Sequence, residues 1–160
     1  MAEDFADGGK VAVMVNDNAS VASMVTIAEE QVAGLKDGVK KTDLEIVVFR
    51  PAGHAQSVFS DHPDPNAVQE FVAQADGAVA IVSFVPFPFA RFKSEAIPPV
   101  YLHDPYGSGY WKRWMKAGKA AAAAYPHMNF HRMQNADAQR GSPEERFGAM
   151  FDLATPETLN

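Results

Sequence analysis

The stretch AVAIVSF, residues 78–84, is apolar at every position except Ser83. It follows Asp76-Gly77, a pair that is typical of turns. A strand that is apolar at successive positions is buried on both faces, and such strands occur in parallel sheets covered by helices on each side. The stretch therefore predicts the centre of an α/β fold.

Strands and helices alternate on the N-terminal side of this stretch. Residues 10–15 predict a strand, and LEIVVF, residues 44–49, predicts another. Residues 65–75 predict a short helix, because proline suits the first helical turn. A longer helix is expected between the two strands, ending at Asp37-Gly38. Its apolar stripe consists of Val21, Met24, Val25, Ala28, Val32 and Leu35.

The C-terminal side continues the alternation. PPVYLH, residues 98–103, predicts a strand, and residues 109–125 are expected to form one helix because alanine is the best helix former. HMNFHRMQ, residues 127–134, offers a further strand. Residues 142–154 predict a last helix that opens with a capping box between Ser142 and Glu145. This order predicts a three-layer, doubly wound parallel sheet of four to five strands with right-handed crossovers.

Length and composition predict one domain of 160 residues, with residues 1–9 as a flexible leader. No stretch of 18 uncharged apolar residues is present, so no membrane partner is expected. The net charge of −6 argues against a nucleic-acid partner, because phosphate binding needs a basic surface. Cysteine is absent, which excludes disulfides and thiolate chemistry and leaves the cytoplasm as the default location.

Ligands of doubly wound sheets bind outside the carboxyl ends of the strands. Three loops follow predicted strands at that edge: residues 16–20, 83–89 and 103–110. They are far apart in the sequence, but the predicted topology brings them together. We therefore expect a small-molecule site where these loops meet.

The first loop, Asn16-Asp17-Asn18-Ala19-Ser20, leads into a helix N-terminus. Free backbone N–H groups and the helix dipole attract a phosphate there, and Asn18, Ser20 and Ser23 would add hydrogen bonds. The alternative is that an Asn or Ser only caps the helix. Asp17 disfavours an anion, because its charge would repel it.

The second loop contains Phe84, Phe87 and Phe89 together with two prolines. Aromatic rings at the end of a strand can stack on a planar ligand. The alternative is that these rings pack in a satellite core or form a dimer contact. Together with Phe92, Trp111 and Trp114 they predict self-association into a homo-oligomer, because the chain has more aromatic surface than it readily buries alone.

The third loop carries Gly107-Ser108-Gly109 at a predicted helix start, flanked by Tyr106 and Tyr110. Glycines allow a ligand to approach the backbone closely, so Gly109→Val is expected to abolish ligand binding with little effect on thermal stability. His103-Asp104 resembles an acid–base pair. Adjacent residues of an extended chain point to opposite sides, however, so we do not expect this dyad.

Two further groups of residues have simple interpretations. Residues His127, Asn129 and His131 would share one face of a strand and suggest a metal pair, but no third ligand is evident, so we expect surface or interface histidines and no metal. A basic cluster at helical spacing predicts a solvated helix face. It consists of Lys112, Arg113, Lys116 and Lys119.

Three segments together resemble a known family. KVAVMVNDNASVASMVTIAEEQVAGL (10–35), LEIVVFRPAG (44–53) and QADGAVAIVSFVPFPFARFKSEA (74–96) are similar to flavodoxin-like proteins, particularly the quinone oxidoreductases that bind FMN. The similarity covers about the first 95 residues. The family carries glycine and hydroxyl side chains in its phosphate loop, where this chain has Asp17 and Ala19, and a glycine after the third strand that this chain lacks.

The resemblance implies an FMN-dependent NAD(P)H oxidoreductase that acts on a quinone or a similar small acceptor. FMN would supply the hydride chemistry, so no catalytic side chain is required. Asn18, Ser20 and Ser23 would hold the phosphate. Phe84, Phe87 and Tyr106 would border the isoalloxazine. The backbone of Gly107, Ser108 and Gly109 would donate to the pyrimidine side.

Two other functions stay open. The first is a flavin-free flavodoxin-like subunit that binds or assembles with a partner, which the acidic Asp17 and the missing glycines favour. The second is an enzyme that acts on a nucleotide or sugar phosphate with Asp17 or Asp104 as its working carboxylate.

Overall fold

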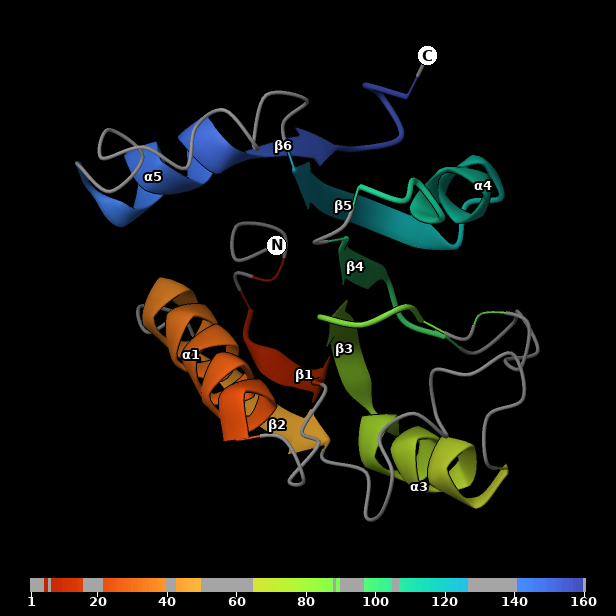
Figure 1. Ribbon diagram of the computed structural model, residues 1–160. Helices are drawn as coiled ribbons and strands as arrows, with labels where there is room; N and C mark the ends of the chain where they lie inside the picture. The colour runs from red at the N-terminus through yellow and green to blue at the C-terminus, as the bar shows by residue number, and fades with distance from the viewer. Residues whose placement is uncertain are drawn as a thin grey trace.

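The computed structural model describes residues 5, 7–15, 22–39, 43–49, 65–87, 89, 97–104, 107–126 and 141–159. Strands and helices alternate along most of this length (Figure 1). The elements are β1 (Gly9–Met14), α1 (Ala22–Val39), β2 (Leu44–Phe49), α3 (Pro65–Ala75), β3 (Ala78–Ser83), β4 (Val100–His103), α4 (Trp111–Lys116), β5 (Ala120–Pro126), α5 (Pro143–Met150) and β6 (Phe151–Ala154).

The described strands form one six-stranded sheet with the order β2-β1-β3-β4-β5-β6. The first five strands in the chain pair in parallel, as expected. β6 pairs antiparallel with β5, so the expectation of four to five strands, all parallel, is wrong at this edge. The fold is α/β with a single, mostly parallel sheet.

Helices lie on both faces of the sheet, α1 on one and α3 with α4 on the other (Figure 1). Each face has its own apolar cluster. Under α1, Ala28 and Val32 of the expected stripe pack against the valines of β1. On the opposite face, Phe71 and Trp111 belong to a cluster with residues of all six described strands, among them Met14 and Ile81.

The central position of β3 is confirmed. It lies between β1 and β4, and Ala80 and Ile81 are at most 1% exposed. Ala78 and Val79, at the start of the strand, are only partly buried. A strand that is covered by helices on both faces must be apolar at nearly every position. That pattern in residues 78–84 is the one from which the fold was inferred.

The helix α1 continues past Asp37-Gly38, where we expected it to end. Val39 lies seven residues after Val32 and is therefore on the same side of the helix. Both side chains are buried, at 5% and 7% exposure. Burial of Val39 therefore extends the helix through a glycine that would otherwise favour termination.

The prediction of one helix over residues 109–125 is wrong. The helix α4 ends at Lys116, and the alanine run forms β5. Gly118 has a φ of +70°, and its N–H donates to the Met115 carbonyl while that of Lys119 donates to Trp114. This is a Schellman C-cap, which terminates a helix. Tertiary pairing then overrides the helix preference of alanine, because small side chains fit the buried strand.

The last predicted helix is also too long. Its capping box is confirmed: the Glu145 N–H donates to the Ser142 hydroxyl, and the Ser142 N–H donates to the Glu145 carboxylate. The helix stops at Met150, however, and Phe151 has extended backbone angles. Residues 151–154 pair with β5 instead, because the edge of a sheet offers unpaired backbone groups that a following segment can satisfy.

Self-association was predicted from six aromatic side chains that one chain was not expected to bury, and three of the six are buried. Phe87, Phe89 and Trp111 are at most 4% exposed within one chain. Phe84 and Trp114 are partly buried, and Phe92 lies outside the described residues. Self-association stays a prediction without this support.

Two other expectations touch the described residues. Phe5 belongs to the segment expected to be a flexible leader, and its ring meets Tyr101 of β4 edge-on, with centroids 6.3 Å apart. No helix in the described part of the chain has the length and apolarity that a membrane span requires.

Candidate functional site

The carboxyl ends of β1, β3 and β4 lie next to each other, as the topology predicts. Hydrogen bonds tie the loops that follow them to neighbouring strands. The Phe84 N–H donates to the Met14 carbonyl at 3.0 Å, which joins the end of β3 to the end of β1. The Asp104 N–H donates to the Ala124 carbonyl at 2.8 Å, which joins the end of β4 to β5. This edge is the candidate site.

Several residues of the predicted site lie outside the described part of the chain. Ser23 is in α1, but its side chain is not described. The phosphate contacts therefore stay a prediction. The predicted residues that fall wholly outside the described ranges are Asn18, Ser20, Tyr106, Asp17, His127, Asn129 and His131.

Two of the three loop phenylalanines belong to the core. Phe87 is 4% exposed and meets Phe71 edge-on, with ring centroids 5.9 Å apart. Phe89 is 1% exposed, lies 4.8 Å from the Phe87 ring and is stacked on Trp114. Both rings are enclosed by protein, so Phe87 has no free face to border a ligand. Packing, the alternative interpretation of this loop, holds for these two residues.

Phe84 differs from its neighbours because it stays partly exposed at the end of β3. Its ring meets the imidazole of His103 at the end of β4, with centroids 5.8 Å apart. The bond from its N–H to Met14 also fixes its backbone beside β1. Phe84 is therefore the predicted aromatic residue that the structure keeps at the meeting point of β1, β3 and β4.

Asp104 organises the third loop. This carboxylate is 1% exposed, and it accepts hydrogen bonds from the Gly109 N–H at 2.8 Å and from the Ser108 hydroxyl at 3.1 Å. The Gly107 N–H donates to the Asp104 carbonyl at 3.3 Å. The N–H groups of both glycines are thus used inside the loop, although we expected them to face a ligand. Asp104 is a positioning residue for the loop.

Gly109 is required by the backbone. Its φ is +69°, a conformation that costs other residues about 1–2 kcal/mol. The expectation that a substitution would leave stability unchanged is therefore wrong. We expect Gly109→Ala to lower the free energy of unfolding by about 1–2 kcal/mol in urea denaturation.

Gly34→Ala is the matched control for this substitution. Gly34 lies inside α1, and a Cβ there would meet no atom within 4 Å. Alanine should stabilise a helix interior by about 0.5–1 kcal/mol. Equal unfolding midpoints for the Gly109→Ala protein and the wild type would show that the loop tolerates a side chain and that ligand approach, not conformation, is the reason for this glycine.

His103 was considered only as part of a dyad, and the structure gives it different surroundings. Its ring lies 5.8 Å from Phe84 and 5.3 Å from Phe151, and its Nδ1 is buried with no hydrogen-bond partner among the described residues. Burial lowers the pKa of His103 below its ordinary value of 6.5, and the charge of Asp104 opposes this only in part. The imidazole is therefore held neutral. Successive residues of a strand point to opposite faces, so His103 lies on the same face as Tyr101, two residues earlier. This alternation was the signal in the sequence for the placement of His103.

The lowered pKa of His103 predicts a pH dependence of stability. Because the unfolded chain binds a proton more readily at this residue, the contribution of His103 is fully present above about pH 6.5 and is lost as the pH falls toward the folded pKa. The free energy of unfolding should decrease between pH 7.5 and pH 5.5, and His103→Gln should make this decrease smaller. Urea titrations of both proteins at the two pH values test this, and identical pH slopes would contradict it.

Tyr110 follows the glycines and starts the turn into α4. Its hydroxyl is buried, and the backbone of Phe87 lies close to it. Burial raises the pKa of the Tyr110 phenol above its usual range, and Asp104 raises it further. The phenol thus stays protonated and is no general base.

Within the described residues, no group of three His, Asp or Glu side chains is arranged to hold a metal ion. The arrangement at this edge offers an aromatic ring, a neutral imidazole and a loop whose donors are already bonded. It suits ligand binding better than acid–base catalysis. Comparison of the chain with family models, with curated proteins and with solved structures found no match.

Proposed function

We propose that this chain is a flavodoxin-like protein, with helical layers on both faces of its sheet, that binds FMN at the meeting point of β1 and β3. In this proposal it works as an FMN-dependent NAD(P)H oxidoreductase on a quinone or similar small acceptor. Bound FMN would supply the hydride chemistry. The chain's own residues would position the ring and the phosphate.

The observation that carries the proposal is the strand order β2-β1-β3-β4-β5 with parallel pairing. The chain passes from β1 to β2 on one side, returns to β3 on the other side of β1, and then continues outward to β4 and β5. The direction of the crossovers therefore reverses between β1 and β3. A crevice forms at such a switch point, and proteins of this strand order bind FMN there. Phe84 lies at this point and offers an aromatic surface.

The other observations divide the proposed contacts into two groups. Phe84 and the residues of the first loop stay candidates for FMN binding. Phe87, Gly107 and Gly109 do not support it, because their ring or N–H groups are already engaged within the protein. FMN binding therefore depends chiefly on the loop between β1 and α1.

Asp17 gives the sharpest test of that loop. A carboxylate 4 Å from a phosphate costs about 1 kcal/mol in water and about 4 kcal/mol at the effective dielectric of a protein surface. FMN binds only if Asp17 is turned away, so Asp17→Asn should tighten binding by about fivefold or leave it unchanged. Quenching of FMN fluorescence on titration measures both affinities.

Asp43→Asn is the control, because Asp43 is exposed just before β2, at the amino end of the sheet. It should leave the affinity for FMN as it is. A sharp loss of FMN binding in Asp17→Asn alone would contradict the proposed phosphate contact and would indicate that the carboxylate serves a different ligand.

The second candidate is a flavin-free binding or assembly subunit. The hydrogen bonds from Gly109 and Ser108 to Asp104 favour it, because they leave the third loop with fewer free donors than an FMN site uses. Absence of FMN binding to the wild type and to both variants would favour this candidate.

A further inference from the structure

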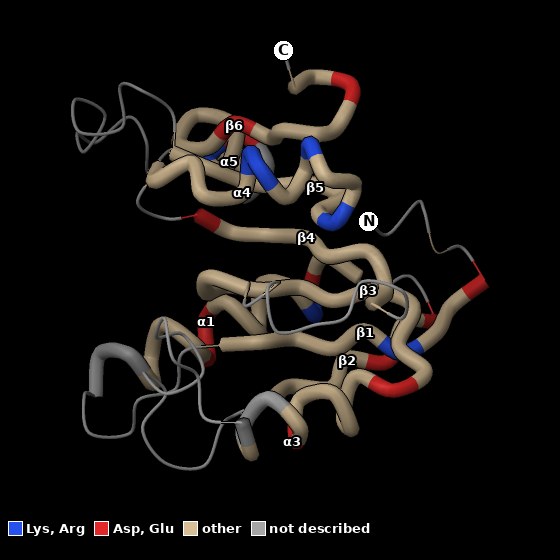
Figure 2. Tube along the Cα trace, turned by 90° about the vertical axis from the view of Figure 1, so that its right-hand side faces the viewer, with Lys and Arg blue, Asp and Glu red and all other residues tan. Residues whose placement is uncertain are grey.

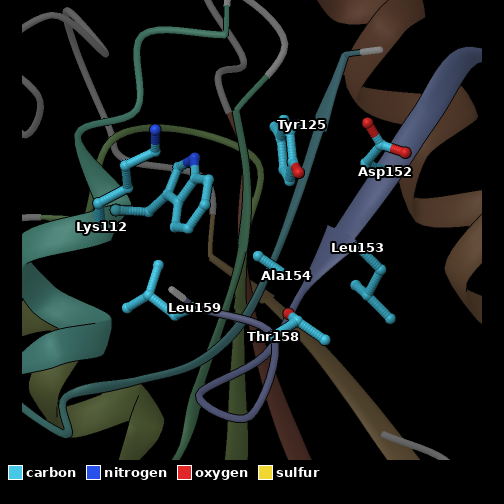
Figure 3. Close-up of a pocket in the computed structure, with 8 residues that line it drawn as sticks. Lys112, Tyr125, Asp152, Leu153, Ala154, Thr158 and Leu159 are labelled. Carbon is cyan, nitrogen blue, oxygen red and sulfur yellow. The ribbon is translucent and has the colours of Figure 1, made fainter.

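A cavity lies away from the β1/β3 edge, between α4, β5, β6 and the C-terminal turn (Figure 3). Its volume is about 430 Å³, within the range of about 300–1,000 Å³ that is usual for small-molecule sites. In the sheet, β4 lies between the strands of this cavity, β5 and β6, and the strands of the proposed FMN site, β1 and β3. Four segments thus converge on one space that the proposed function does not use.

Aromatic and aliphatic side chains form one part of the lining of this cavity, beside the polar Lys112, Asp152 and Thr158. Trp111 and Tyr125 line it with ring centroids 5.1 Å apart, and Ala154 and Leu159 complete the apolar surface. Leu159 is partly buried against the core, and Ala154 is 5% exposed. Figure 3 shows Leu159 and Ala154 below Tyr125. These side chains form a small apolar patch within a lining that is otherwise largely polar.

Two opposite charges stand on either side of the apolar part. Figure 3 shows Lys112 on the α4 side and Asp152 on the β6 side, with Tyr125 between them. Asp152 pairs with Tyr125 across the strands, so both side chains are on the same face of the sheet. Neither charge has an ion-pair partner in the described part of the chain, and the Lys112 ammonium lies 5.7 Å from the centroid of the Trp111 ring.

The wider charge distribution also places positive charge on the α4 side of the cavity. Lys and Arg positions gather around α4 and β5, in the part of the molecule where the acidic position of β6 also lies (Figure 2). Arg113 and Lys119 are held over the ring of Trp114, with Arg113 4.5 Å from its centroid. Lys112 is thus the cation of this cluster that lines the cavity.

Trp111 also has an unused donor. It is 2% exposed, and its indole Nε1 is buried with no hydrogen-bond partner among the described residues. A buried donor without a partner is costly in a folded protein and often marks a site where a ligand or water completes the bonding. This donor belongs to a residue that lines the cavity.

We propose that this cavity binds a small zwitterion with an apolar side chain, that is, an α-amino acid. The carboxylate of the ligand pairs with Lys112, its ammonium group pairs with Asp152, and its side chain packs against Trp111, Tyr125 and Leu159. A ligand with one charge alone would leave the opposite protein charge without a partner. The proposal does not depend on FMN binding, because it uses none of the residues at the β1/β3 edge.

Tryptophan fluorescence tests the proposal in a Trp114→Phe background. The chain has two tryptophans, so this substitution leaves Trp111 as the reporter. L-leucine is the probe, with 3-methylbutylamine and 4-methylpentanoate as analogues that lack its carboxylate and its ammonium group. We expect saturable binding of leucine below about 10 mM, and binding at least about tenfold weaker for each analogue, because each lacks a charge-assisted hydrogen bond.

Lys112→Met and Asp152→Asn should each weaken leucine binding by about tenfold. Lys116→Met is the matched control, because Lys116 is exposed on the same helix and does not line the cavity. Calorimetry with the wild-type chain repeats the leucine titration if the Trp114→Phe protein does not fold. Absence of saturable leucine binding, equal affinities for leucine and an analogue, or an equal loss in Lys116→Met would each overturn the proposal.

Discussion

Replacing Phe71 with alanine is expected to lower the free energy of unfolding by about 3–5 kcal/mol. Phe71 is fully buried on α3, and its ring meets Phe49 of β2 at 5.3 Å and Phe87 at 5.9 Å. The substitution removes a ring that joins the helix to the sheet and to the loop after β3, and it leaves a cavity that rigid strands cannot fill.

Urea denaturation at constant pH measures this loss. Val72→Ala is the matched control, since Val72 is the next residue of α3 and is 47% exposed. It should change stability by no more than about 0.5 kcal/mol. Similar small effects of the two substitutions would mean that α3 does not pack on the sheet through Phe71, and the account of that face of the fold would be wrong.

Replacing Asp104 with alanine is expected to lower the free energy of unfolding by about 1.5–3 kcal/mol. The carboxylate is 1% exposed and accepts from Gly109 and Ser108. Alanine leaves the Gly109 N–H without its acceptor in a partly buried loop, whereas the exposed Ser108 can bond to water. Asp104→Asn should cost less, because the amide oxygen can still accept from Gly109.

Thermal and urea unfolding of both variants test the role of Asp104. Asp76→Ala is the control, because Asp76 is an exposed carboxylate in the turn before β3. If Asp104→Ala were as stable as this control, the hydrogen bonds would not hold the loop. Asp104 would then be free for the catalytic use that the sequence left open.

The N-terminal half of the fold follows closely from local patterns. β2 and α3 have the predicted ends, and α3 lies between Pro65 and the turn at Asp76-Gly77. The errors occur where tertiary contacts override local preference. The alanine run of β5 has the composition of a helix, and Phe151 continues a helical pattern, but both segments complete the sheet instead.

The candidate site was predictable as a location more than as a set of contacts. Parallel topology alone brings the loops after β1, β3 and β4 to one edge. The sequence does not reveal that Phe87 packs on Phe71, or that Asp104 already accepts from Gly109, because these contacts depend on how the folded loop closes.

One available signal for the fold was missed. Gly118 follows a basic helical turn, a place that is typical of a helix C-cap, and it would have predicted the end of the helix before the alanine run.

Reconstitution with FMN tests the central proposal most directly. The purified chain is incubated with excess FMN, freed from unbound flavin by gel filtration, and examined by visible absorption spectroscopy. The account predicts a protein fraction with the yellow flavin spectrum at about one FMN per chain. A folded but colourless protein fraction would contradict FMN binding at the β1/β3 edge.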